Sequence, residues 1–229
     1  MNVPLKREEK KIGFIRRRYL FDPAVLDEIR RKGIGRPLPE AFDIITAELA
    51  KAYPGHICTT RNWIFNNAGG AMGQLNLLHG SLSEYLIFFG TCIGTEGHSG
   101  RYASEVYDFM IQGEMLCEYE GRFEPETHTV HTPAAYLGSK IIKHYCIKSD
   151  AWMLEYCRGS VPRMFPFGNA DSMFSTLDIR TMARLSRQYA ILTVRSLLRG
   201  KDLALLLRMI VFLAAVGACA WQAIAFLTS

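Results

Sequence analysis

The C-terminal part of the chain holds an uncharged apolar run, which restricts the possible architectures more than any other feature. Met209 to Leu227 carries no charged residue, and residues 203–207 extend the apolar character upstream of Arg208. At the helical rise of about 1.5 Å per residue, this run is ~28 Å long, close to the ~30 Å hydrocarbon core of a bilayer. We therefore expect residues 203–229 to form a membrane anchor helix; the alternative is a buried core helix. Trp221 adds the aromatic character of a membrane interface.

Basic residues are concentrated on the N-terminal side of this run. They are Arg195, Arg199, Lys201 and Arg208. Because basic residues flank membrane spans on the cytoplasmic side, we expect the rest of the chain to face the cytosol. Residues 1–18 are a second basic stretch, and no apolar segment of the kind found in secretory signal peptides follows them. We interpret them as a solvated basic arm, with contact to lipid headgroups as the alternative.

Composition excludes several classes of protein. A hydrophobic content of 49% over 229 residues excludes a disordered chain. A net charge of +5 is too small for a nucleic-acid-binding surface. The six cysteines are scattered without a CxxC pair, so we expect free thiols rather than disulfides or a zinc site. The histidines form no tight ligand set apart from the weak pair His128 and His131, so we expect no metal site.

Turn residues and periodicity predict an α+β fold. Asp22 begins a helix, and a second amphipathic helix covers residues 39–53. Residues from about 63 to 100 are apolar and rich in glycine. Short alternating runs follow, for example at 129–131, 140–147 and 151–156, and Gly, Pro and Ser-Asp turns separate them, which is typical of antiparallel strands. Ser175 is the expected N-cap of a further helix that ends near Gly200.

Two short motifs resemble those of short-chain dehydrogenases. Asn66–Gly69 matches their NNAG motif, and Tyr136 with Lys140 matches their YxxxK motif. That fold also needs a glycine-rich turn after its first strand, far upstream, to bind the pyrophosphate. The preceding residues are basic or helical and offer no strand before a suitable turn. We therefore reject a nicotinamide-dependent oxidoreductase.

Three acidic residues lie within apolar runs, where an ionised carboxylate is costly to bury. They are Glu84, Asp108 and Glu155. Glu155 alternates with Trp152, Leu154 and Tyr156 and shares a strand face with Met153. Two such carboxylates in one apolar cavity would share a proton, with one pKa raised and the other low. The alternative is that each acid is capped by an Arg or a backbone amide.

Several longer segments resemble one known family. These are Trp63–Gln74, Leu77–Tyr85 and Phe89–Gly100, with shorter matches at Tyr19–Pro23, Pro54–His56, Trp152–Gly159, Phe165–Gly168 and Phe174–Asp178. They are similar to the fungal sterol Δ8–Δ7 isomerases, a family that also contains the sigma non-opioid receptor. The resemblance covers about residues 19–200 and is loose between 115 and 150. Ala71, where the receptor has an aromatic residue, favours the isomerase branch together with Asn66, Asn67 and residues 95–97. The chain also departs from the receptor at its start, where it has a basic arm and the receptor has a membrane helix.

The resemblance implies a cupin-like antiparallel β-barrel flanked by N- and C-terminal helices, with the C-terminal pair facing a membrane. It implies that Glu155, Asp108 and Tyr85 are catalytic, with Tyr85 hydrogen-bonded to the glutamate. Substrate-binding positions fall on Met72, Leu75, Ile87, Phe89, Tyr102, Phe165 and Tyr189. Gly69 and Gly73 match a GxxxG at the receptor's trimer contact, so a homotrimer is expected.

On this basis we expect an isomerase of sterol biosynthesis in the endoplasmic reticulum membrane, anchored at its C-terminus. Its partners would be a sterol, the bilayer and further copies of the chain, with no nucleic acid and no cofactor. A proton would add to carbon 9 of a Δ8 sterol, a cation would form at carbon 8, and a proton would leave carbon 7. We expect Glu155 to be the charge that faces the cation and Asp108 to be its proton-sharing partner, although the order could be reversed. The alternative function is a non-catalytic, sigma-receptor-like binder of cationic amphiphiles that acts through partner proteins.

Overall fold

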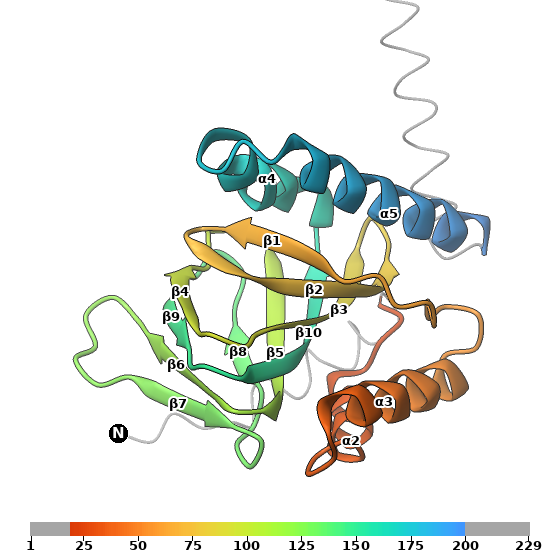
Figure 1. Ribbon diagram of the computed structural model, residues 1–229, viewed down its shortest axis with the longest axis horizontal. Helices are drawn as coiled ribbons and strands as arrows, with labels where there is room; N and C mark the ends of the chain where they lie inside the picture. Colours follow the sequence, from red (N-terminus) through yellow and green to blue (C-terminus); the bar gives the residue numbers. More distant parts are fainter. Residues whose placement is uncertain (1–18, 200–229) are drawn as a thin grey trace, which may run out of the picture.

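A computed structural model describes residues 19–199, which form ten strands and four α-helices (Figure 1). The strands are β1 (Ile64–Ala68), β2 (Ala71–Gly80), β3 (Glu84–Thr91), β4 (Thr95–His98), β5 (Ser104–Gln112), β6 (Glu114–Glu118), β7 (Glu126–Thr129), β8 (Ala135–Leu137), β9 (His144–Ile147) and β10 (Ala151–Gly159). The helices are α2 (Pro23–Arg31), α3 (Leu38–Ala52), α4 (Phe165–Phe174) and α5 (Ile179–Leu198), with a 3-10 turn, η2, at Val161–Met164. The α+β composition agrees with the prediction.

The strands form two antiparallel sheets. The larger has the order β1-β2-β3-β10-β5-β8, and the smaller has the order β4-β9-β6-β7. One apolar cluster contains side chains from both, including Ile87 and Met153 from the larger sheet and Met115 and Ile147 from the smaller. The predicted barrel is therefore built as two sheets facing each other around an apolar interior.

Alternation along β10 separates two parts of the core. Trp152, Leu154 and Tyr156 pack with α2 and α3 on the outer face of the larger sheet. Met153 belongs to the inner cluster, and Glu155 lines a cavity on the same side. The two faces predicted from the sequence are confirmed, because successive side chains of a strand point to opposite sides.

The two N-terminal helices begin and end close to the predicted positions. Asp22 caps α2 by accepting a hydrogen bond from the backbone N–H of Ala24, and Pro23 occupies the first turn. Glycine and proline between residues 33 and 37 separate α2 from α3. The two helices lie together on one side of the molecule (Figure 1).

The C-terminal helices differ from the prediction at their junction. Ser175 ends α4, and Asp178 caps α5 by accepting a hydrogen bond from the backbone N–H of Thr181. The predicted N-cap at Ser175 is wrong because residues 165–174 already form a helix, so the chain must turn before α5 begins. Both helices lie over β1 and β2 (Figure 1). The predicted helix end at Gly200 lies outside the described residues.

Two predicted segments also lie outside the described residues: the basic arm at 1–18 and the anchor at 203–229. Across residues 19–199, no helix combines the length and the apolar character that a membrane span requires.

The hairpin topology excludes the dehydrogenase interpretation. All strand pairs in the described part of the chain are antiparallel. Asn66–Gly69 ends β1 and enters the turn to β2, where Gly69 and Gly70 have φ of 63° and 86°. The motif therefore serves a tight turn and not a parallel nucleotide-binding sheet.

Candidate active site

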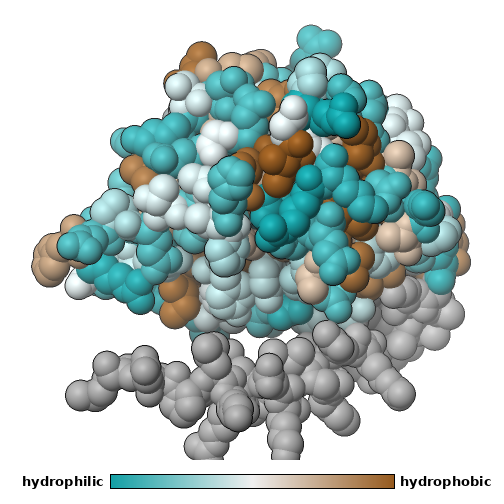
Figure 2. Space-filling model, turned by 90° about the horizontal axis from the view of Figure 1, so that it is seen from below, coloured by the Kyte–Doolittle hydropathy of each residue, from teal (hydrophilic) through white to brown (hydrophobic). Residues whose placement is uncertain are grey.

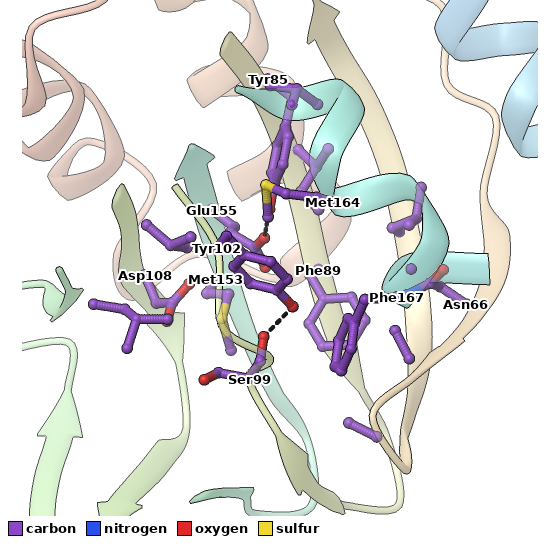
Figure 3. Close-up of a pocket in the computed structure, with 18 of the residues that line it drawn as sticks. Asn66, Tyr85, Phe89, Ser99, Tyr102, Asp108, Met153, Glu155, Met164 and Phe167 are labelled. Carbon is purple, nitrogen blue, oxygen red and sulfur yellow. Dashed lines mark hydrogen bonds between the residues drawn. The ribbon is translucent and has the colours of Figure 1, made fainter. Parts of the chain in front are cut away.

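A cavity of about 210 Å³ lies between the two sheets and beneath α4 and α5 (Figure 3). Its walls are mostly apolar, and four ionisable residue types reach them: Asp, Glu, Lys and Tyr. An enclosed apolar pocket with a few polar groups is typical of small-molecule sites.

Asp108 and Glu155 meet in this cavity. Asp108 on β5 is the direct register partner of Glu155 on β10, so both side chains leave the same face of the sheet. Figure 3 shows both pointing into the cavity. The two acids are 47 positions apart in the sequence (155 − 108), and only antiparallel pairing of their strands brings them together.

The pKa of Glu155 is raised, so that this side chain gains or loses a proton near neutral pH. Burial, together with the negative charge of Asp108, raises its pKa to about 7. The Tyr85 hydroxyl donates a hydrogen bond to Glu155 Oε1 at 2.5 Å, which acts in the opposite direction (Figure 3). Burial raises the pKa of Tyr85 well above its usual value, so the phenol keeps its proton. Glu155 is therefore neutral at slightly acidic pH and ionised at alkaline pH.

Asp108 has a different environment because a lysine accompanies it. Lys143 Nζ lies 2.8 Å from Asp108 Oδ2, and both side chains are less than a tenth exposed. In a buried ion pair of this kind, each charge compensates the other. The acids are thus unequal: Asp108 has a counter-ion, and Glu155 has a neutral phenol. The prediction that the two acids share a proton did not include this lysine, and the sharing itself stays a prediction.

Most of the predicted wall positions line the cavity. They are Leu75, Ile87, Phe89, Tyr102, Phe165 and Tyr189. Met72 does not: it is 48% exposed and lies on the outer side of β2. Its placement in the wall is wrong because positions 72 and 75 are three apart, and only even spacings share a face of a regular strand. Ala71 lines the cavity instead.

The family model for "ERG2 and Sigma1 receptor like protein" matches residues 9–201. The chain belongs to this family.

Relatives of this chain include proteins named as isomerases and proteins named as receptors. It is 48% identical to "Protein erg2 homolog" of Dictyostelium discoideum, over 69% of this chain and 68% of the relative. It is 40% identical to "C-8 sterol isomerase erg2" of Aspergillus fumigatus, over 80% and 78%. It is 41% identical to "Sigma non-opioid intracellular receptor 1" of Gallus gallus, over 76% and 78%.

The solved structures that resemble this chain do so only distantly. An RmlC-like cupin from Shewanella frigidimarina is 13% identical, with a TM-score of 0.38, over 48% of this chain and 95% of that one.

Sequence reasoning missed several residues of the site in this family member, above all Lys143. The lysine lies in the segment where the resemblance is loose, and nothing in the alternating run 140–147 distinguishes it from Lys140. Other missed wall residues include Asn66, Ser99, Tyr145, Met164 and Phe167. Met153, predicted to share a strand face with Glu155, also lines the cavity.

The third buried acid, Glu84, lies outside the cavity. Glu84 accepts hydrogen bonds from the backbone N–H groups of Leu20 and Phe21 and from the Tyr156 hydroxyl. It fastens the segment before α2 to the outer face of the larger sheet. The alternative of capping by backbone amides is therefore correct for Glu84.

The glycines expected at a trimer contact have roles within the chain. A Cβ at Gly69 would lie 2.1 Å from the backbone oxygen of His98, and one at Gly73 would lie 2.7 Å from that of Gly90. Close approach of neighbouring strands therefore requires glycine at both positions. Within residues 19–199, no three His, Cys, Asp or Glu side chains are grouped closely enough to hold a metal ion.

Proposed function

We propose that this protein is a sterol isomerase that moves a ring double bond from Δ8 to Δ7 through a carbocation. The observation that carries the proposal is the buried pairing of Glu155 with Asp108 in an apolar cavity. Support also comes from relatives named C-8 sterol isomerase, such as those of Aspergillus fumigatus and Gibberella zeae, at 40% and 36% identity. The reaction needs an acid, an apolar slot for a flat ring system and negative charge beside the cation.

The geometry supports Glu155 as the acid, the reverse of the order favoured from the sequence. Its neutral carboxyl adds a proton to carbon 9, which leaves a tertiary cation at carbon 8. The Asp108 carboxylate and the newly formed Glu155 carboxylate stabilise this cation. One of them accepts the proton that leaves carbon 7, and a proton shift between the register partners restores the starting state. Tyr85 orients Glu155 throughout.

Replacement of the acid tests this mechanism. Glu155→Gln keeps the shape of the side chain but cannot donate a proton to carbon, so we expect turnover of a Δ8 sterol to fall by ~10²–10⁴-fold. Glu105→Gln is the matched control, because Glu105 lies on β5 but pairs with Arg158 away from the cavity. Near-normal isomerisation by Glu155→Gln would remove the two acids from the mechanism.

The substrate reaches the cavity through the layer made by α4 and α5. Both helices contribute cavity-lining residues, among them Phe165, Phe167, Leu185 and Tyr189. The same layer carries exposed apolar side chains, including Phe174 and Leu177. In this proposal the layer lies against the endoplasmic reticulum membrane, residues 203–229 anchor the chain, and the protein assembles as a homo-oligomer, a trimer by resemblance.

A non-catalytic binder of cationic amphiphiles is the second candidate function. Its support is the 41% identity to the Gallus gallus sigma non-opioid intracellular receptor 1. Expression in an isomerase-deficient yeast strain separates the two functions. We expect growth with accumulation of Δ7 sterols for the isomerase; tight amine binding without rescue would identify the binder.

A further inference from the structure

A second cavity, of about 120 Å³, lies beside the C-terminal end of α5. It shares no lining residue with the cavity that holds Glu155, so the two are separate features of the molecule. The loop between α3 and β1 forms one wall, α5 forms the other, and β2 contributes one side chain. The lining residues are Gly55, His56, Ile57, Cys58, His79, Leu192, Arg195, Ser196 and Arg199.

The lining of this second cavity is basic. It includes two arginines and two histidines, and none of the described residues that form it is an Asp or a Glu. Across residues 19–199, no ion pair includes Arg195 or Arg199. Arginine in the last turn of a helix stabilises the helix end, but that role requires neither a cavity nor a second basic wall. A basic hollow without an acid favours an anion.

Helical spacing places the α5 side chains of this cavity on one face of the helix. Leu192, Arg195, Ser196 and Arg199 are separated by three or four residues. Ser196 is buried, whereas both arginines are exposed, so the hydroxyl group lies at the base of the cavity and the guanidinium groups lie at its rim. A Cβ at Gly55 would lie 3.5 Å from Arg199 Cζ, so this guanidinium group is close to the opposite wall.

Hydrogen bonds fix the wall opposite α5. The Cys58 N–H donates to the backbone oxygen of Leu78 on β2 at 2.7 Å. His79 Nδ1 donates to the His56 carbonyl oxygen at 2.9 Å. The loop is therefore fastened to the sheet at two points, and a preformed wall reduces the entropy that a ligand loses on binding.

We propose that this second cavity binds a phosphate group, held by the guanidinium groups of Arg195 and Arg199 at its rim and by the hydroxyl group of Ser196 at its base. Arginine suits a phosphate because its planar group donates two parallel hydrogen bonds to two oxygens. Two guanidinium groups match a phosphomonoester, whose charge at neutral pH is about −1.5 to −2. The site is independent of the proposed isomerisation.

Neighbouring side chains favour a phosphate that is carried by a lipid. Ile191 and Leu198 are exposed and lie four residues before and three residues after Arg195, so they flank this arginine on the helix surface. A lipid with its phosphate in the cavity would place its acyl chains against these apolar side chains. A free phosphate makes no such contact, so the affinities of the two sources distinguish them.

Titrations of the full-length chain in a nonionic detergent test the site. The probes are dihexanoyl phosphatidic acid, inorganic phosphate and dihexanoylglycerol, which lacks a phosphate. In Arg195→Gln/Arg199→Gln we expect the affinity for dihexanoyl phosphatidic acid to fall roughly tenfold or more, because two charged donors are lost. Binding of dihexanoylglycerol should be the same in this variant and in the wild type. Tighter binding of the phosphatidic acid than of inorganic phosphate would identify a lipid headgroup, and the reverse would identify a soluble phosphate.

Two further variants make the test specific. Arg180→Gln/Arg187→Gln is the matched control, because it also removes two exposed arginines from α5 and neither lines the cavity. Its affinity for either phosphate probe should change less than about twofold. Ser196→Ala removes the hydroxyl group at the base and should weaken binding about threefold or more.

Three results would overturn the inference. The first is a wild-type chain that binds neither phosphate probe. The second is an equal loss of affinity in the two arginine pairs, which would indicate a general attraction to the basic helix. The third is wild-type affinity in Ser196→Ala, which would place the phosphate on the surface. The replaced arginines are exposed, so these variants should keep their fold, which circular dichroism checks.

Discussion

At the scale of single residues, the site depends on different neighbours for two identical functional groups. Glu155 and Asp108 carry the same carboxyl group and share one cavity. Tyr85 faces one of them and Lys143 faces the other. The ammonium group compensates the charge of Asp108, whereas Glu155, whose pKa is raised to about 7, has only a neutral phenol beside it and can donate a proton.

The pH dependence of turnover follows from Glu155. Its pKa is raised to about 7, so the neutral acid is present below this pH and lost above it. We expect kcat/KM for a Δ8 sterol to fall as pH rises through about 7, with the protein otherwise intact. Stability changes in the same direction, because a raised carboxyl pKa means that the folded chain loses its proton-linked stabilisation as pH rises through that value.

Tyr85→Phe should move this profile. The hydroxyl favours the ionised form of Glu155 by donating to it, so its removal raises the pKa of Glu155 further. The falling limb of the kcat/KM profile should therefore shift to higher pH. Tyr136→Phe, on β8 at the surface, is the control and should leave the profile in place. A shift to lower pH in Tyr85→Phe would contradict the assignment of the acid.

At the scale of elements, three neighbouring strands of the larger sheet serve the cavity on one face and the α2–α3 layer on the other. The order β3-β10-β5 places Tyr85, Glu155 and Asp108 on consecutive strands. The outer face of the same strands packs Phe88, Leu154 and Phe109 with the helices. Because side chains alternate, the outer packing fixes the direction in which the functional groups point.

Glu84 binds the segment before α2 to the outer face of the larger sheet. Its replacement therefore tests the stability of this packing and not the reaction in the cavity. Glu84→Gln turns a triple acceptor into a weaker one and places an amide N–H₂ against backbone donors. We expect a loss of about 2–4 kcal/mol in the free energy of unfolding, measured by urea titration. Glu105→Gln, at a partly exposed position of the same sheet, should lower the free energy of unfolding far less. Equal losses in the two variants would contradict a special role for Glu84.

At the scale of the whole molecule, exposed apolar side chains are concentrated on α4 and α5 and on the turn between them. They are Met173, Phe174, Leu177, Ile179, Ile191, Val194 and Leu198, with Leu198 and Phe174 exposed by 81% and 78%. The face seen from below, opposite these helices, is mainly hydrophilic and has some apolar patches (Figure 2). Exposed apolar side chains of this kind are what the proposed contact with a membrane requires.

Substrate delivery tests the membrane role of this surface. In Phe174→Asp/Leu177→Asp we expect KM for a sterol presented in vesicles to rise several-fold, because charges oppose contact with the bilayer. Turnover of detergent-solubilised sterol should be unchanged. Phe123→Asp is the control, because Phe123 is 97% exposed and lies between β6 and β7, away from α4 and α5. Equal effects on both forms of substrate would argue against a membrane-facing layer.

Local patterns in the sequence were sufficient for much of this structure. The cap at Asp22, the breaks between residues 33 and 37 and the two faces of β10 follow from backbone and periodicity rules that act within a few residues. The buried acids could also be recognised, since a carboxylate inside an apolar run is costly to bury without a partner. The outward position of Met72 was within reach of the same alternation rule.

The tertiary structure alone decided which partner each acid received. Lys143 is 35 positions from Asp108 in the sequence, and its approach depends on the pairing of β9 with β4 and on the Ser99 contacts. Glu84 and Glu155 look alike in the sequence, yet one meets backbone amides and the other a cavity. The charge of a buried group is set by the groups that lie within a few ångströms of it in space, and neighbours in the sequence do not determine which groups these are.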